Sequence, residues 1–285
     1  MCRFLAYRGA PIICDELLFK PENSLIHQSY CAREREEPLN GDGFGIGWYE
    51  KDIDQTPAVF VSIQPAWSNR NLLSVAPKIK TDCLFAHVRA ATEGTVSESN
   101  CHPFRYENYL MMHNGEVGGF SHIKREVRRR LSDLVYEWVD GTTDTQHFYA
   151  LFLDDILQKK GELGVKDIAE SLLATIKHIN EIKQKYNVEE SCYLNLAVTD
   201  GEVIVATRYV SDPDMPAATL YYSEGSSYEC QDGVCMMKHS RSGDQAVIVV
   251  SEKLTNIEYD WHEVPVNHII TVDRDLTVKM QPITE

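Results

Sequence analysis

A cysteine stands directly after Met1, and this position allows chemistry that an internal cysteine lacks. If Met1 is removed, Cys2 carries a thiol and a free α-amine on one residue. The thiol has an ordinary pKa of about 8.5 and attacks only as a thiolate. The amine has a pKa of about 7.7–8.0, so part of it is neutral near pH 7 and can take the proton. Cys2 could therefore be nucleophile and base together, although the position alone could also be an accident.

Polar residues further along the chain could complete a site that cleaves an amide. Arg89 offers a planar guanidinium to a carboxylate, and Asp144 could accept hydrogen bonds from an ammonium group. Asn114 and Gly115 offer a side-chain amide and a backbone N–H as donors to an oxyanion. Each residue alone has a structural explanation, namely a salt bridge, a hairpin turn or a helix-dipole charge. Their joint occurrence with Cys2 favours a site for an amino-acid substrate.

The predicted elements would bring these residues together. The apolar segment 4–8 predicts a buried strand that fixes the N-terminal end. A second apolar strand, 84–92, ends in polar residues, as strands that carry a site often do. Glycines alternate with large apolar residues over 41–48, which predicts a strand with one face open to close approach. The Asn114-Gly115 pair follows the apolar run 109–112 and predicts a turn.

The middle of the chain is predicted to be helical and the last third to be rich in strands. The patterns indicate helices over 120–139, from 143 onward and over 168–186. Five basic residues in the first of these indicate a solvated helix face, with an anion site as the alternative: Lys124, Arg125, Arg128, Arg129 and Arg130. The order of strands, helices and strands predicts one α+β domain. Strands are expected at 194–199, 203–208, 219–223, 246–250 and 268–273.

The net charge, the apolar runs and the cysteine content of the sequence exclude several classes of function. The 285 residues include 28 basic and 43 acidic residues, and the net charge of −15 argues against nucleic acid and against anionic membrane surfaces. No secretory signal and no apolar run near ~18 residues is visible, so we expect a cytoplasmic protein. The eight cysteines are scattered, and most should be free. Cys230, Cys235 and His239 could form a metal loop, but no second ligand pair accompanies them, so no metal or other cofactor is predicted.

The motifs together resemble the class II glutamine amidotransferases, which use an N-terminal nucleophile. The matching segments occur in the family's order: MCRFLAY at 1–7, NGDGFG at 40–45, HVRAAT at 87–92, HPF at 102–104, HNG at 113–115 and TD at 143–144. Three further segments are similar to a stand-alone subfamily: PAWS at 65–68, LNLAVTDG at 194–201 and WHEVP at 261–265. That subfamily includes γ-glutamyl amidohydrolases of ergothioneine biosynthesis and a subunit of a glutathione-degrading complex.

The resemblance implies a four-layer αββα fold with two stacked antiparallel sheets, formed by residues 2–285 as one domain. It implies that Cys2 is the nucleophile, with its own α-amine as base. By position, Arg89 and Asp144 would bind the substrate head group, and Asn114 and Gly115 would form the oxyanion hole. Pocket-lining residues are also implied, namely Thr92 and His102.

Two departures bear on function. Ala90 stands where amidotransferases of sugar-phosphate synthesis have a tryptophan linked to ammonia channelling, and Gln146 stands where the subfamily usually has glutamate. No synthase domain follows. We therefore expect a hydrolase that cleaves the γ-glutamyl amide of glutamine or of a γ-glutamyl compound through a Cys2 thioester. The alternatives are a glutaminase subunit that delivers ammonia to a separate synthase partner and a catalytically silent binding subunit.

Overall fold

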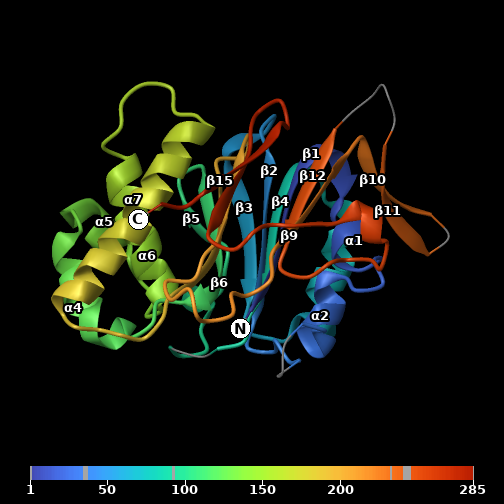
Figure 1. Ribbon diagram of the computed structural model, residues 1–285. Helices are drawn as coiled ribbons and strands as arrows, with labels where there is room; N and C mark the ends of the chain where they lie inside the picture. Colours follow the sequence, from blue (N-terminus) through green and yellow to red (C-terminus); the bar gives the residue numbers. More distant parts are fainter. Residues whose placement is uncertain (1, 35–37, 92–93, 232, 240–244, 285) are drawn as a thin grey trace.

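A computed structural model of the protein describes residues 2–34, 38–91, 94–231, 233–239 and 245–284. Two antiparallel sheets lie face to face, and a group of helices covers the outer surface of each sheet (Figure 1). The layers follow the order helix, sheet, sheet, helix. This arrangement confirms the predicted α+β fold with four layers.

The sheet that carries the N-terminal end has seven strands, and the first strand of the chain lies in its middle. That strand pairs with residues 246–250 on one side and with residues 80–88 on the other. Cys2 therefore directly precedes a strand that is held by neighbours from both ends of the sequence. Across the sheet the strands are β13 (His262–Glu263), β9 (Tyr221–Gly225), β12 (Ala246–Val250), β1 (Arg3–Ile13), β4 (Lys80–Val88), β2 (Phe44–Glu50) and β3 (Asp54–Ser62).

The second sheet has six strands, and one of the sequence predictions fails there. The predicted turn at Asn114-Gly115 is wrong, because both residues lie inside a strand and pair with Asn195 and Leu194. Long-range pairing has overridden the local turn preference of Asn-Gly. Across this sheet the strands are β15 (Val278–Pro282), β14 (His268–Val272), β8 (Ile204–Arg208), β7 (Tyr193–Thr199), β6 (Tyr109–Glu116) and β5 (Phe104–Tyr106).

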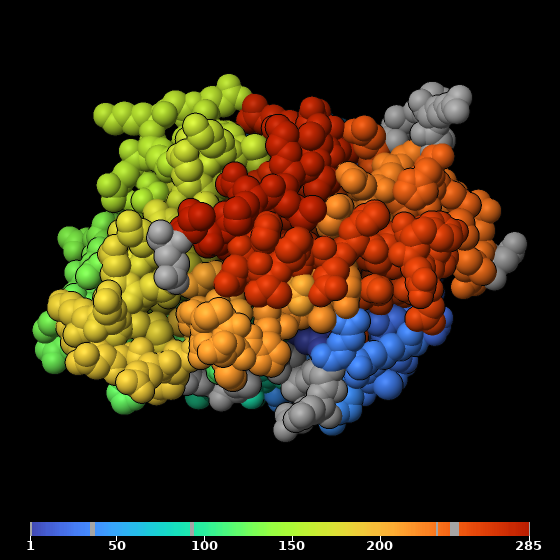
Figure 2. Space-filling model, in the orientation of Figure 1, coloured from blue at the N-terminus to red at the C-terminus, as the bar shows by residue number. Residues whose placement is uncertain are grey.

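The C-terminal third supplies strands to both sheets. β9, β12 and β13 belong to the first sheet, whereas β14 and β15 belong to the second. Figure 2 shows these orange and red segments covering one face of the molecule across both halves. The two sheets are thereby joined by the chain itself as well as by their packing.

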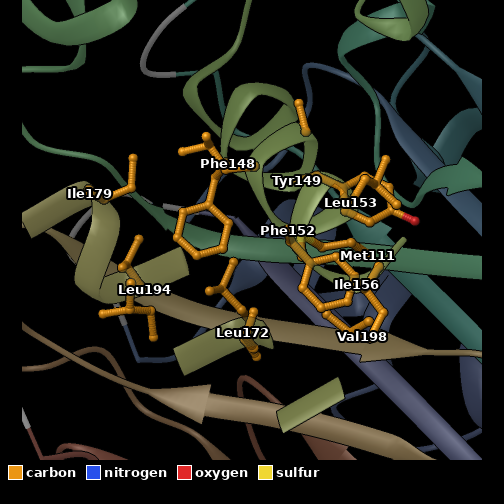
Figure 3. Packing of buried hydrophobic residues seen from close by; sticks show 14 of the residues in the cluster. Met111, Phe148, Tyr149, Phe152, Leu153, Ile156, Leu172, Ile179, Leu194 and Val198 are labelled. Carbon is orange, nitrogen blue, oxygen red and sulfur yellow. The ribbon is translucent and has the colours of Figure 1, made fainter. Parts of the chain in front are cut away.

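The larger helical layer covers the six-stranded sheet. Phe148 and Phe152 from one helix and Leu172 from the next pack on Met111 and Val198 of the sheet (Figure 3). This apolar burial is the main stabilising contribution in this layer. The expected helix over 120–139 is two helices, because the chain turns at Leu131 and Ser132. The helices here are α4 (Phe120–Arg130), α5 (Asp133–Trp138), α6 (Asp144–Ile156) and α7 (Val165–Lys185).

Shorter elements cover the outer face of the seven-stranded sheet. One of these helices begins after Ser24, whose Oγ accepts a hydrogen bond from the backbone N–H of His27 at 3.2 Å. Such a cap stabilises the first turn of a helix. The helices are α1 (Cys14–Leu18), α2 (Leu25–Cys31) and α3 (Arg70–Val75), with four short 3-10 turns elsewhere, and a hairpin of β10 (Ser227–Gln231) and β11 (Val234–Lys238) lies beside them.

The metal loop that Cys230, Cys235 and His239 could have formed is not present. Cys230 and Cys235 face each other across β10 and β11 and are joined by a disulfide. A disulfide sulfur is not the thiolate that a metal would need. The other six cysteines of the chain are free, in agreement with the sequence-based expectation. Within the described ranges, no helix combines the length and the apolar character that crossing a membrane requires.

The glycine-rich strand β2 has the close contacts that its pattern predicts. A Cβ atom on Gly45 would lie 2.3 Å from the carbonyl oxygen of His102, and one on Gly47 would lie 2.7 Å from Leu110 Cδ1. These glycines let the two sheets approach each other next to the buried side chains of Phe4 and Phe85.

Candidate active site

Cys2 lies where β1 begins and contacts the chain just beyond the end of β4. Its sulfur is 3.4 Å from the backbone nitrogen of Ala90 and 3.5 Å from the carbonyl oxygen of that residue. Burial raises the pKa of the Cys2 thiol, and the Ala90 N–H and the charges of Arg89 and Arg3 only partly oppose this shift. The thiol is therefore neutral near pH 7. A base must remove its proton before it can attack.

Arg89 directly follows β4 and precedes Ala90, whose backbone contacts this thiol. Its backbone N–H donates to the carbonyl of Gly43 at 2.8 Å, and its carbonyl accepts from the N–H of Asp42 at 2.9 Å. The carboxylate of Asp42 also accepts from the N–H of Ala91 at 2.8 Å. The loop before β2 therefore fixes the backbone on both sides of Arg89. The guanidinium is buried and donates to the carbonyl of Thr95 at 3.3 Å.

Asn114 belongs to the opposite sheet, but one hydroxyl connects it to β1, the strand that follows Cys2. Its Nδ2 donates to Ser251 Oγ at 3.4 Å, and the same oxygen accepts from the backbone N–H of Phe4 at 3.0 Å. Ser251 thus joins β1 and β6 two residues from Cys2. Asn114 Oδ1 is buried and has no hydrogen-bond donor in the described part of the chain. An unpaired buried oxygen is unfavourable, so it is suited to pairing with a bound group.

Gly115 is required by the backbone geometry. Its φ angle is +151°, a value that residues with a side chain rarely adopt. A Cβ atom there would lie 1.8 Å from the carbonyl oxygen of Tyr193 and 2.8 Å from His113 Nε2. No side chain fits at this position, so the close approach of β7 to β6 depends on the glycine.

Asp144 is the first residue of α6 and is held beside the end of β6. Thr143 caps the helix, its hydroxyl accepting from the N–H of Gln146 at 3.3 Å. The Asp144 carboxylate accepts from the N–H of Val117 at 2.6 Å and from the N–H of Thr145 at 2.7 Å. Val117 directly follows β6, so Asp144 lies one step from the strand that carries Asn114. A carboxylate has about four acceptor positions, which leaves capacity for an ammonium group.

Gln146 is directed toward the loop before α6. Its Nε2 donates to Asp140 at 2.7 Å, and its Oε1 accepts from the backbone N–H of Gly141 at 2.5 Å. The side chain is buried. Gln146 therefore holds the segment that leads into the Thr143 cap. The residue that departs from the subfamily pattern thus has a structural role.

His102 lies in a cluster of buried histidines between the sheets. His87 Nε2 is 3.1 Å from His102 Nδ1 and 3.1 Å from the carbonyl oxygen of His113, whose N–H also points to His102 Nδ1 at 3.4 Å. Burial lowers the pKa of His87 to about 3 and that of His102 well below its ordinary value. Both rings are neutral near pH 7, so the cluster adds no charge beside Arg89. Thr92 lies outside the described residues.

A buried ion pair behind Cys2 was not found from the sequence. Arg3 Nε lies 2.5 Å from Glu252 Oε1, and Arg3 Nη1 donates to the carbonyl of Cys2 at 2.8 Å. Burial alone would raise the pKa of Glu252, but the Arg3 charge and the N–H of Arg33 outweigh burial and lower this pKa. Arg3 adjoins Cys2 in sequence, which is the one local signal. Glu252 and Ser251 carry none, because their partners lie at the opposite end of the chain.

Comparison with known proteins points to one family. A family model described as class II glutamine amidotransferases matches residues 18–283. The probable glutamine amidotransferase DUG3 of Saccharomyces cerevisiae is 38% identical over 304 residues, an alignment that covers 100% of this chain and 85% of that protein. The γ-glutamyl-hercynylcysteine sulfoxide hydrolase of Mycobacterium tuberculosis is 37% identical over 119 residues, which are 41% of this chain and 50% of that protein.

Solved structures show the same fold at lower identity. A class II domain protein from Silicibacter pomeroyi superposes with a TM-score of 0.67 at 23% identity and covers 99% of both chains. The glutamine phosphoribosylpyrophosphate amidotransferase of Bacillus subtilis gives 0.61 at 15% identity, covering 99% of this chain and 49% of that one. These matches agree with the layered architecture described above.

Proposed function

The chain belongs to the class II glutamine amidotransferases, enzymes that act on amide bonds, and we propose that it hydrolyses γ-glutamyl amides through a thioester on Cys2. The proposal depends most on the contact through Ser251, which joins Asn114 to the nucleophile strand at Phe4. A nucleophile on one sheet and an oxyanion donor on the other thus lie at one gap. We also propose that residues 2–285 act as a single domain, supported by the shared strands of the C-terminal third.

The substrate head group would lie between Arg89 and Asp144. The buried guanidinium would bind the α-carboxylate, and the carboxylate at the start of α6 would accept from the α-ammonium. Both side chains are almost fully buried, at 3% and 8% exposure, so charge pairing there is little screened by water. Thr92 and His102 would line the pocket around this head group.

The reaction would proceed in two acyl-transfer steps. After removal of Met1, the Cys2 amine takes the thiol proton, and the sulfur attacks the γ-carbonyl carbon. The negative charge on the carbonyl oxygen is stabilised by Asn114 Nδ2 and the Gly115 N–H. The tetrahedral intermediate then expels the amine, which leaves with a proton from the Cys2 ammonium group. Water, deprotonated by the same amine, cleaves the thioester and releases the free γ-carboxylate.

The names of the relatives support a γ-glutamyl substrate, but they do not identify the amine that is released from it. One is named for glutamine amide chemistry and another for hydrolysis of a γ-glutamyl compound. Delivery of ammonia to a separate synthase is the alternative. A stable synthase partner in a pull-down, with less free ammonia released in its presence, would favour that alternative. Ala90 supplies only a methyl side chain beside the thiol, so it cannot replace the tryptophan linked to channelling in related enzymes.

The test is hydrolysis of glutamine, glutathione and other γ-glutamyl compounds by the wild type and by Cys2→Ala. We expect at least one substrate to be cleaved and the variant to lose roughly 10⁴-fold or more in kcat, as loss of a covalent nucleophile does. Cys31→Ala is the matched control, since that thiol is free and exposed. Full activity in Cys2→Ala, or no cleavage of any γ-glutamyl compound by the wild type, would contradict the proposal.

A further inference from the structure

The basic residues of α4 form a surface feature that the amide-cleaving site does not use. Residues of α4 and α5 line a hollow of about 560 Å³. The two helices lie at the edge of the helical layer (Figure 1). No carboxylate is among the described residues that line it, although the whole chain has a net charge of −15. Its lining consists of Ser121, Lys124, Arg125, Arg128, Arg129 and Tyr136.

The four cations form two neighbouring rows on one helix. Lys124 stands above Arg128, and Arg125 stands above Arg129, each pair four residues apart. Like charges at this spacing repel each other and destabilise a helix. A bound anion would remove that repulsion. The arrangement is thus unfavourable without a ligand and favourable with one.

Arg128 is positioned by a neutral partner. Its Nε donates to His147 Nε2 at 2.8 Å, and the other ring nitrogen of His147 lies 2.7 Å from the carbonyl oxygen of Thr143. Because a guanidinium only donates, His147 must accept at Nε2 and donate from Nδ1. Burial lowers the pKa of His147 to about 4, so the ring is uncharged near pH 7. The guanidinium is held in place while its charge is left uncompensated by His147.

The neighbouring carboxylate lies closest to cations that do not line the hollow. Glu126 lies 3.0 Å from Lys185 of α7, and it approaches Arg130 at 3.7 Å and Arg129 at 3.9 Å. Glu126 therefore partly neutralises the charge of Arg129. Tyr136 of α5 closes the hollow opposite the helix, with its ring centre 6.0 Å from the Arg128 guanidinium carbon.

We propose that this hollow binds a phosphorylated small molecule, with Arg125 and Arg128 holding the phosphoryl oxygens and Ser121 donating from its hydroxyl. Guanidinium groups match phosphate oxygens with paired donors. The cations span only about 8 Å along the helix axis, a length that suits one or two phosphoryl groups. An acidic peptide is extended, at about 3.3 Å per residue, and would need a longer row of cations.

Isothermal titration with pyrophosphate tests this proposal at about 0.1 M ionic strength, where distant charges are screened. The wild type should bind one equivalent. Arg125→Gln and Arg128→Gln should each weaken binding roughly tenfold, because each loses a charge-assisted hydrogen bond. Arg70→Gln removes an exposed cation on α3 and is the matched control, which should bind as the wild type does.

Further titrations distinguish between the possible ligands. Inorganic phosphate and a nucleoside triphosphate distinguish a single phosphoryl group from a longer chain, and binding of either supports the site. Arg125 is exposed, so its variant remains decisive if Arg128→Gln does not fold. No heat with any phosphoryl compound, equal weakening in all three variants, or tighter binding of hexaglutamate would overturn the proposal. Cys2→Ala should bind pyrophosphate normally, so this result is independent of the proposed hydrolysis.

Discussion

The two sheets contribute different kinds of residue to the candidate site, and they are held in different ways. The seven-stranded sheet carries Cys2 and Arg89 and depends on contacts between distant parts of the chain, such as Arg3 with Glu252. The six-stranded sheet carries Asn114, and its strand β6 ends beside the carboxylate of Asp144. This sheet depends on the backbone geometry at Gly115, which only glycine allows. We therefore expect loss of the Arg3–Glu252 pair to act mainly on stability and loss of the Asn114 side chain to act mainly on kcat, whereas a side chain at Gly115 should affect both.

Among the variants that test this comparison, Gly115→Ala is expected to have the largest combined effect on stability and on kcat. The added methyl group would meet the carbonyl of Tyr193 at 1.8 Å, and the φ angle of +151° would be strained. We expect the free energy of unfolding to fall by about 3 kcal/mol or more and kcat by roughly 10³-fold or more. Chemical denaturation and initial rates measure the two effects. Gly164→Ala is the control, because nothing lies within 4 Å of a Cβ atom there.

Glu252→Gln tests the support behind the nucleophile. The change leaves the buried Arg3 charge without its partner, which typically lowers the free energy of unfolding by about 3–5 kcal/mol. Because the pKa of Glu252 is lowered in the folded protein, the ion pair stabilises above the unfolded pKa of about 4.3 and is lost as pH falls through the lower folded pKa.

Urea unfolding of wild type and Glu252→Gln at several pH values measures this contribution. The difference between them should be full at pH 7 and should shrink below about pH 4. Glu162→Gln removes an exposed carboxylate that pairs with Arg274, and its free energy of unfolding should stay close to that of the wild type at every pH. A difference that stays constant down to pH 3 would show that Arg3 and Glu252 do not interact as described.

Asn114→Ala tests the oxyanion role of the second sheet. Loss of one such donor should lower kcat roughly 10²–10³-fold while KM changes little. Initial rates over a range of substrate concentrations separate the two constants. An increase in KM alone would assign Asn114 to ground-state binding and would break the proposed division between the sheets.

Ser251→Ala should have the smallest effect of the set. The variant loses the hydroxyl that accepts from Asn114 and from the backbone of Phe4, which should lower kcat about tenfold through misplacement of Asn114. Ser74→Ala, on the exposed face of α3, is the control and should behave as the wild type. Unchanged kcat in Ser251→Ala would show that the contact between the sheets does not position Asn114.

The sequence predicted the elements whose signals are local. The apolar periodicity of α6 and α7 and the glycine face of β2 follow from neighbouring residues, and each is present in the structure. The family resemblance supplied the layered architecture. Cys2, Arg89 and Asp144 could be proposed because each stands in a short motif at the end of a predicted element.

The predictions that failed concern residues whose partners are far away in sequence. Asn114-Gly115 has a strong local turn preference, but pairing with β7 keeps both residues in a strand. The break between α4 and α5 reflects Ser132, whose backbone N–H donates to Asp154 of α6 at 2.8 Å. The role of Ser251 in joining the two sheets could not be predicted either, because nothing near it in sequence indicates a contact with Phe4.

Covalent labelling tests the central claim most directly. The wild type would be treated with a diazo-ketone analogue of glutamine, and its mass and peptides would then be measured. We predict one adduct per chain, on a peptide that begins at Cys2 and lacks Met1, and none on Cys2→Ala. An adduct on another cysteine such as Cys31 or Cys101, or active and labelled protein that retains Met1, would contradict the account.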